Sequence, residues 1–170
     1  YSKRQWLFCK ESILDLKIEL NKIGLNLIIK TGNVYDIFEE IKNKYIIKGI
    51  YSHQETGDFF TFNRDKKIRE WAKNNNIYWN EYLQFAVFRG LSNRNNWHKK
   101  WSTFINKKIP SVTKKHISLN IYSEEIPQDD FFQFEHDKCI GRLKGGRGEA
   151  LKRLDYFFNK KIISYSKDIS

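Results

Sequence analysis

The chain has 170 residues, 40% of them hydrophobic and 16% aromatic, which is enough apolar surface for one packed globular domain. Lys and Arg number 31 against 20 Asp and Glu, a formal net charge of +11 that favours a polyanionic partner such as nucleic acid, although a lysine-coated soluble surface explains the same excess. No apolar stretch approaches the roughly 20 residues of a membrane span, and two cysteines are too few for a disulfide framework, so we expect a cytoplasmic protein without a membrane segment.

The first 45 residues combine helical periodicity with one short apolar run. A helix is predicted over 3–22, capped by Ser2 and ended by Gly24, because apolar side chains recur at spacings of three and four: Trp6, Cys9, Ile13, Leu16, Leu20 and Ile23. The run 25–29 is too brief for a helix and is expected to be a strand covered on both faces. A second helix is predicted over 34–45, with Asn33 as a possible cap.

Strand-like and helix-like segments then continue to alternate. The sequence predicts strands over 46–51 and 77–82 with a helix over 61–75 between them. A further helix is predicted around 97–105, with Asn93 as a candidate cap. Three successive strand and helix units indicate a parallel sheet, so the predicted fold class is α/β.

Periodicity fades after Pro110. Pro127 and the polar residues up to about Arg142 favour an irregular, extended connector. An amphipathic C-terminal helix is predicted from Ala150 onward. We therefore divide the sequence into an α/β domain of residues 1–109, a connector of residues 110–142 and the start of another domain over residues 143–170.

A candidate binding site lies at the end of the second predicted strand, in the sequence SHQETGDFF at positions 52–60. His53, Gln54 and Glu55 are nominated to line a crevice there, because parallel sheets expose their ligand site at the carboxyl ends of their strands. The alternative is structural. Glu55 and Thr56 would then cap the next helix, and the adjacent Phe59 and Phe60 would fill a gap between domains.

Other chemistry-bearing residues do not complete a motif. His136 and Cys139 lack the partners of a four-ligand zinc site, since His98 and His116 are isolated in the sequence, so no metal is expected. The patterns Ser-x-x-Lys at 111–114 and Lys-Thr-Gly at 30–32 occur in reversed order for a serine acyl-enzyme, and chance explains them better.

Two further patterns leave alternatives open. Glycines at 141, 145, 146 and 148 could cradle a phosphate, but no strand leads into this turn, which favours a flexible approach to a helix N-terminus. A mix of aromatic and basic residues typical of single-strand binders follows: Tyr78, Trp79, Tyr82, Arg89, Arg94 and Lys99. Core positions in a parallel strand explain the same aromatics.

Several consecutive blocks of the sequence resemble the cryptochrome and DNA photolyase family. They are YSKRQWLFCKESILDLKIEL, YSHQETGDFFTFNRDKKIREWAKNNNIYWNEYLQFAVFRGL, RNNWHKKWSTF and GGRGEALKRLDYFF. The most specific features are SHQETG followed by aromatics and by Arg64 and Asp65, and then the tryptophans at 97 and 101. The resemblance implies that residues 1–109 are a Rossmann-like antenna domain and that residues from 143 begin a helical FAD-binding domain.

The resemblance also implies cofactors and a partner. In this family a reduced, excited FAD passes an electron to a pyrimidine dimer flipped out of damaged DNA. Tyr165, with Asp168, resembles the start of the flavin-binding region, where a tyrosine approaches the cofactor phosphates. The crevice of His53, Gln54 and Glu55 would correspond to the antenna pigment site, but the sequence departs from better-known branches here and leaves the pigment unidentified.

Family members have two more strands before the segment that begins at Tyr1 and a large helical domain after the segment that ends at Ser170, so we expect a partial or trimmed chain. The segment 25–29 is then not expected to pair directly with 46–51. The chain alone is expected neither to retain FAD nor to repair DNA, because most of a cofactor site would lie elsewhere. The alternatives are a blue-light signalling cryptochrome, a stand-alone basic α/β module that binds nucleotide or nucleic acid, and an inactive gene product.

Overall fold

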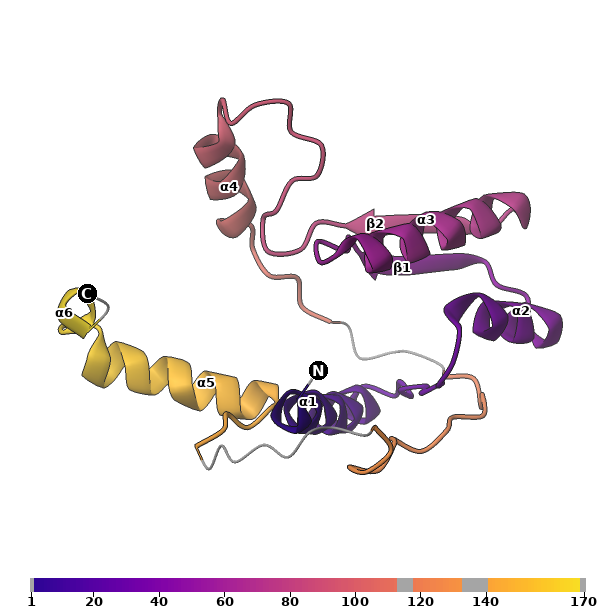
Figure 1. Cartoon of the computed structure of the whole chain (residues 1–170), viewed down its shortest axis with the longest axis horizontal. Helices are drawn as coiled ribbons and strands as arrows, with labels where there is room; N and C mark the ends of the chain where they lie inside the picture. The colour runs from indigo at the N-terminus through magenta and orange to yellow at the C-terminus, as the bar shows by residue number, and fades with distance from the viewer. Residues whose placement is uncertain (1, 113–117, 133–140, 169–170) are drawn as a thin grey trace. The chain divides into compact units, whose positions relative to one another are not determined.

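The structure is a computed structural model that describes residues 2–112, 118–132 and 141–168. These residues form two compact units, one of residues 31–111 and one that joins residues 1–30 to residues 112–170. Figure 1 shows the helices and strands in chain order. The predicted division at residues 109 and 142 stays a prediction.

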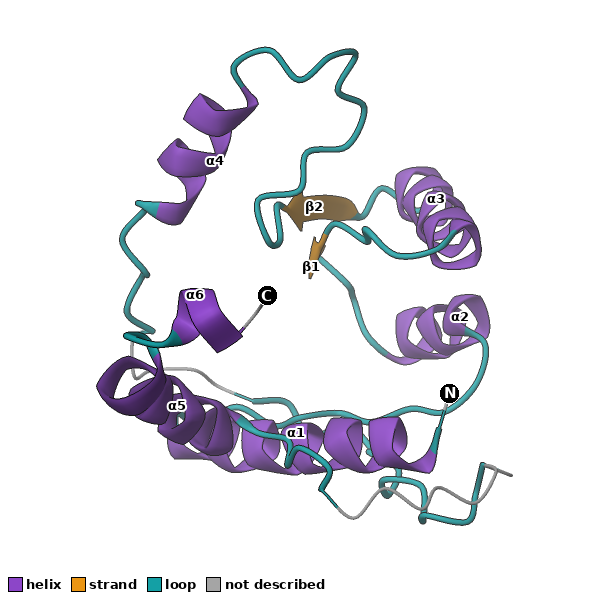
Figure 2. Ribbon diagram, turned by 60° about the vertical axis from the view of Figure 1, so that its left-hand side comes forward, coloured by secondary structure: helices purple, strands orange, loops and turns teal. Residues whose placement is uncertain are grey.

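The unit of residues 31–111 is built on a parallel strand pair. Its elements are α2 (Val34–Lys44), β1 (Gly49–His53), α3 (Phe59–Asn74), β2 (Tyr78–Tyr82) and α4 (Trp97–Ile105). β1 and β2 pair in parallel from Gly49 opposite Tyr78 to His53 opposite Tyr82, and α3 makes the crossover between them (Figure 2). The predicted α/β class and the parallel strand, helix, strand order are confirmed.

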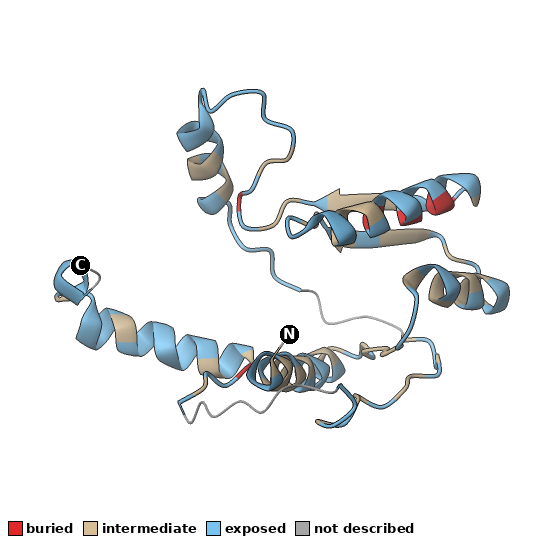
Figure 3. Cartoon of the chain, in the orientation of Figure 1, coloured by how far each residue is buried: buried red, intermediate tan, exposed pale blue. Residues whose placement is uncertain are grey.

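The core of this unit lies under α3. Four residues are buried there, and five partly buried side chains pack against them: Ile68, Trp71, Ala72 and Ile77, with Val34, Phe38, Ile47, Ile50 and Trp79. The buried positions follow one face of α3 (Figure 3). This face therefore holds α2 and both strands around one apolar centre.

Helix caps in this unit follow the local sequence, but neither the Glu55 alternative for α3 nor the Asn93 candidate for α4 holds. Asn33 accepts a hydrogen bond from the Tyr35 amide at 2.9 Å, as predicted. α3 is capped by Asp58, whose Oδ1 accepts from the Thr61 amide at 2.8 Å and whose pKa this bond lowers, so Glu55 is not the cap. α4 begins after Asn96, which has a left-handed backbone (φ 60°), rather than after Asn93.

The other unit opens with α1 (Lys3–Lys22), whose bounds match the prediction. Ser2 and Gln5 form a reciprocal capping box, with bonds of 2.8 and 3.4 Å. At the other end Gly24 adopts φ 80° while the Leu25 amide donates to the Leu20 carbonyl at 3.0 Å. The predicted stop at Gly24 is thus confirmed as a glycine-dependent helix end.

The predicted strand over 25–29 is wrong. The Ile29 carbonyl accepts from the Glu124 amide at 2.9 Å, but the Ile29 amide donates to the Ser123 hydroxyl at 2.9 Å. The Asn26 amide likewise donates to the Ser118 hydroxyl, at 3.2 Å. Side-chain hydroxyls replace the backbone partners of a ladder, which the apolar run alone does not reveal.

The described part of residues 110–142 contains no helix or strand, as predicted for a connector. The C-terminal helix is also confirmed as α5 (Arg147–Tyr156), which continues as a π-helical turn, η1 (Phe157–Lys161). The four-residue α6 (Tyr165–Asp168) follows.

Candidate functional site

A cavity of about 200 Å³ lies at the carboxyl end of β1. It is lined by all three nominated residues together with side chains of α2, α3 and β2: Val34, Phe38, Ile50, Ser52, His53, Gln54, Glu55, Arg64, Asp65, Ile68, Trp79 and Gln84. We call this cavity the β1 crevice. The geometry of a parallel strand pair thus brings the polar residues after β1 against the first turns of α3, as expected for such a sheet.

Charged side chains on α3 form the polar wall of the β1 crevice. Asp65 is only 9% exposed and accepts two bonds from Arg64, at 2.9 Å from Nε and 2.7 Å from Nη2. The Arg64 Nη2 also lies 3.7 Å from the Glu55 carboxylate. One guanidinium therefore faces two carboxylates, and its two bonds give the Asp65 Oδ1 hydrogen-bond partners at low exposure.

Glu55 shapes the turn that leads from β1 into α3. Its Oε1 accepts from the amides of Thr56 and Gly57 at 2.9 and 2.7 Å. Its backbone carbonyl accepts from the Arg89 guanidinium. The carboxylate is therefore largely engaged by its own turn, so Glu55 acts as a positioning residue for the rim of the crevice.

Gln54 carries an unused acceptor. Its backbone amide donates to the Tyr82 carbonyl at 2.8 Å and so extends the β1–β2 ladder by one residue beyond β1. Its Oε1, however, is inaccessible to solvent and has no hydrogen-bond partner among the described residues. A buried, unpaired acceptor costs about 1–3 kcal/mol, so a ligand N–H placed here would relieve a real penalty. His53, by contrast, is exposed at the end of β1.

A second cavity, of about 440 Å³, adjoins the β1 crevice. The two share Val34, Arg64 and Ile68 among their lining residues. The larger one is also lined by Phe59 and Phe60, which are 75% and 79% exposed. We call it the aromatic mouth. Two adjacent exposed rings beside a polar crevice suit a planar aromatic ligand better than they suit solvent.

From the sequence, Arg64 was noted only as part of the resemblance to a known family and was given no role in the site. Three residues of the aromatic mouth were not predicted at all: Tyr35, Asn63 and Lys67. Arg64 and Lys67 lie one turn apart near the start of α3. The signal for them was their position on the helix that directly follows the nominated strand end, since the N-terminal half of that helix lines the β1 crevice and the aromatic mouth.

The glycine run at 141–148 does not leave its amides open for a phosphate. The amides of Gly145, Gly146 and Arg147 donate to side chains of α1, namely Glu11 at 2.8 Å, Ser12 at 3.1 Å and Asp15 at 2.7 Å. α1 thus supplies the caps that the N-terminus of α5 lacks in its own sequence. The glycines thus lead into a helix N-terminus, as the alternative had it, but through a turn that is held by hydrogen bonds to α1.

This junction predicts a pH dependence. The two bonds from Arg142, at 2.6 and 2.8 Å, and then the Gly145 amide lower the pKa of Glu11 from 4.5 to about 2. Stability from this group is therefore complete above pH 4.5 and lost as the pH falls toward about 2. We expect a loss of about 1 kcal/mol, reduced from the ideal value by solvent contact. Urea unfolding of the chain and of Glu11→Gln at several pH values measures it; equal pH profiles for the two would contradict the assignment.

Tyr165 and the aromatic residues of β2 lie outside the β1 crevice or contribute to the core. Tyr165 belongs to the unit that does not contain the β1 crevice, and its ring packs edge-on against Phe157 at 5.3 Å. The other nominated site residues, His53, Gln54 and Glu55, belong to the unit of residues 31–111. Trp79 packs on the core and donates to the Ser52 hydroxyl at 2.8 Å, whereas Tyr78 and Tyr82 are exposed. Of these three aromatic residues of β2, only Trp79 is therefore a core residue.

Among the residues that the structure describes, no group of three or more His, Cys, Asp or Glu side chains could hold a metal ion. His116, His136 and Cys139 lie outside the described residues. No described helix is both long and apolar enough to cross a membrane.

The unit of residues 31–111 is a parallel α/β unit with a crevice at its strand ends, and a comparison with solved structures identifies the type of fold. The crystal structure of a cryptochrome from Synechocystis sp. PCC6803 matches 98% of this chain with a TM-score of 0.70 and 20% sequence identity. The chain therefore has a cryptochrome/photolyase-like fold. It spans 38% of the length of that cryptochrome. No family model and no curated protein matches the sequence.

Proposed function

We propose that this chain is the pigment-binding α/β part of a cytoplasmic, light-responsive protein of the photolyase/cryptochrome type. The β1 crevice and the aromatic mouth together take a planar heterocyclic pigment, such as a flavin or a pterin. The observation that carries the proposal is the buried, unpaired Oε1 of Gln54 beside the exposed Phe59 and Phe60. Heterocycles of this class offer ring N–H donors and a flat apolar face, which match those two features.

Each residue then has a separate task. Gln54 accepts a ring N–H, and Phe59 and Phe60 cover a face of the ring system. Arg64 and Lys67 supply positive charge at the mouth, where a polar or anionic substituent of the pigment would emerge. When bound, the pigment supplies light absorption. The residues of this chain bind it and exclude water.

For the whole protein we propose flavin-dependent, light-driven repair of pyrimidine dimers in DNA, with blue-light signalling as the alternative. FAD would be the redox cofactor, and Tyr165 would contact its phosphate side. The described residues around Tyr165 do not by themselves form a dinucleotide site, because its ring is engaged by Phe157 and the neighbouring Ser164 hydroxyl bonds Asp168 at 2.8 Å. We therefore expect the 170-residue chain to bind the crevice pigment without retaining FAD.

A titration of the purified chain with riboflavin and with biopterin, followed by ligand fluorescence, tests the pigment site. We expect at least one of the two to bind, and Phe60→Ala to weaken binding about fivefold through the lost ring contact. Gln54→Leu, which removes the acceptor at similar size, should weaken it by a similar factor. Phe85→Ala is the matched control, because Phe85 is 75% exposed and lines neither cavity. Binding that Phe85→Ala weakens and Phe60→Ala leaves intact would refute the site.

A further inference from the structure

We propose that the surface around α4 binds single-stranded nucleic acid. The charge pattern of the sequence points to this surface first. No Asp or Glu occurs between Glu81 and Glu124, whereas the same stretch contains eight Lys and Arg. This acid-free stretch accounts for much of the formal charge of +11. An ordinary solvated surface intersperses both signs, so one-signed clustering favours a polyanion.

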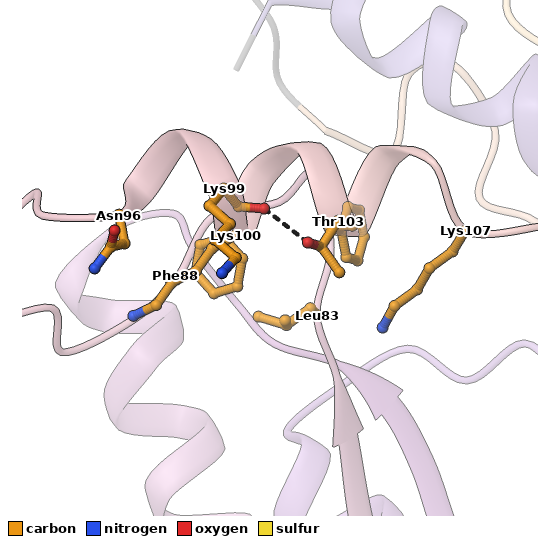
Figure 4. A pocket seen from close by; sticks show the side chains of 8 residues that line it. Leu83, Phe88, Asn96, Lys99, Lys100, Thr103 and Lys107 are labelled. Carbon is orange, nitrogen blue, oxygen red and sulfur yellow. Dashed lines mark hydrogen bonds between the residues drawn. The ribbon is translucent and has the colours of Figure 1, made fainter.

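The structure gathers part of this charge at one cavity. A hollow of about 470 Å³ is lined by α4 and by the segment after β2: Leu83, Phe88, Asn96, Lys99, Lys100, Thr103, Phe104 and Lys107. Figure 4 shows Lys99 and Lys100 on α4, and Lys107 just past the end of this helix, among the residues that line the hollow. Within residues 31–111, no ion pair involves Lys99, Lys100 or Lys107. The ammonium groups of Lys99 and Lys100 on α4, and that of Lys107 two residues past its end, repel one another, and an anion would relieve that repulsion.

Aromatic rings lie among these lysines. The Lys100 Nζ is 6.0 Å from the centroid of the Phe88 ring, and the Lys107 Nζ is 6.0 Å from that of Phe104. The tryptophans at 97 and 101 stack with centroids 6.1 Å apart and planes 21° apart, and Trp97 is 43% exposed. A neighbouring cavity of about 480 Å³, lined by both tryptophans and by Phe85 and Arg94, shares Phe88 with the first. Ring faces and cations therefore alternate around α4.

The mixture of rings and cations favours a single strand over a duplex. The cations can bind the phosphates of either, but the exposed rings can stack only on unpaired bases, which a duplex does not offer. A helix of nine residues is about 14 Å long, enough for a few nucleotides of an extended strand. This surface is separate from the pigment site, because no residue that lines the hollow beside α4 also lines the β1 crevice.

Fluorescence anisotropy of a labelled oligothymidylate of about 12 nucleotides with the full chain tests the proposal. The triple variant Lys99→Ala, Lys100→Ala, Lys107→Ala should lose about 100-fold in affinity near 0.1 M salt, and its salt slope should fall by about two. Alanine favours an exposed helix, so α4 is expected to persist in this variant. Trp97→Ala should weaken binding at least about fivefold with the slope unchanged, and Trp97→Phe should restore most of it.

The matched control removes the same charge elsewhere in the unit, through Lys44→Ala, Lys48→Ala and Lys73→Ala, all of which are exposed residues. We expect this control to keep affinity within about fivefold of the parent chain. Equal losses in the two triple variants would show diffuse charge attraction and overturn the proposal. Unchanged binding in Trp97→Ala, or tighter binding to a duplex of the same sequence, would overturn it as well.

Discussion

Gly145→Ala is expected to detach α5 from α1. A Cβ at this position would lie 2.0 Å from the Phe8 carbonyl oxygen and 2.6 Å from the Ser12 hydroxyl. Both atoms belong to α1, and the first is backbone, so the two segments would have to separate. The cost includes the three side-chain caps of α5 and should reach about 3 kcal/mol or more, the range of overpacking combined with lost caps.

Amide hydrogen exchange over α5, together with urea unfolding, measures this effect. Gly148→Ala is the control, because a Cβ there meets no atom within 4 Å and alanine is the better helix former by about 0.5–1 kcal/mol. We expect Gly145→Ala to lose protection of the α5 amides and Gly148→Ala to keep or increase it. Equal protection in both variants would show that α5 does not dock on α1 through this glycine.

Trp71→Ala is expected to unfold much of the unit of residues 31–111. Trp71 is 3% exposed, and its ring centroid lies 5.4 Å from that of Phe38 and 6.5 Å from that of Tyr35, both on α2. Its Nε1 also donates to Glu39. Truncation to alanine removes the largest side chain of a small core and should cost about 3–5 kcal/mol.

Two variants separate the core from the ligand site. Trp71→Phe keeps a ring but loses the bond to Glu39, so we expect a smaller cost of about 1–2 kcal/mol. Phe60→Ala, at a 79% exposed position, should change stability by less than about 0.5 kcal/mol while it weakens pigment binding. Urea unfolding measures all three. A large stability loss in Phe60→Ala would mean that the aromatic mouth is structural rather than a binding surface.

Much of the fold could be predicted because its signals are local. The bounds of α1 follow from side-chain periodicity and from Ser2 and Gly24, which form the capping box and the left-handed helix end that their residue types favour. The order of β1, α3 and β2 follows from alternation of apolar runs with a helix long enough for a right-handed crossover.

The error over residues 25–29 arose because the hydrogen-bond partners are distant in sequence. The run 25–29 looks like a buried strand, but two of its backbone amides donate to the hydroxyls of Ser118 and Ser123, roughly a hundred residues away, and periodicity does not reveal such partners. The alternative in which Glu55 and Thr56 cap α3 fails because the cap is Asp58. Glu55 instead closes the preceding turn.

The candidate site was predictable in place but not in detail. Parallel pairing puts the ends of β1 and β2 at one edge, so Gln54 and Glu55 could be nominated from sequence alone. The pairing of Asp65 with Arg64 depends on side-chain geometry at the start of α3. The exposure of Phe59 and Phe60 likewise depends on packing, since adjacent aromatics are usually buried.

The most direct test of the pigment site is nuclear magnetic resonance of the chain with riboflavin or biopterin bound. Our account predicts nuclear Overhauser contacts from ring protons of the pigment to Phe59 and Phe60, together with a large shift of the Gln54 side-chain amide. A bound pigment whose contacts fall instead on residues outside the β1 crevice and the aromatic mouth would contradict it.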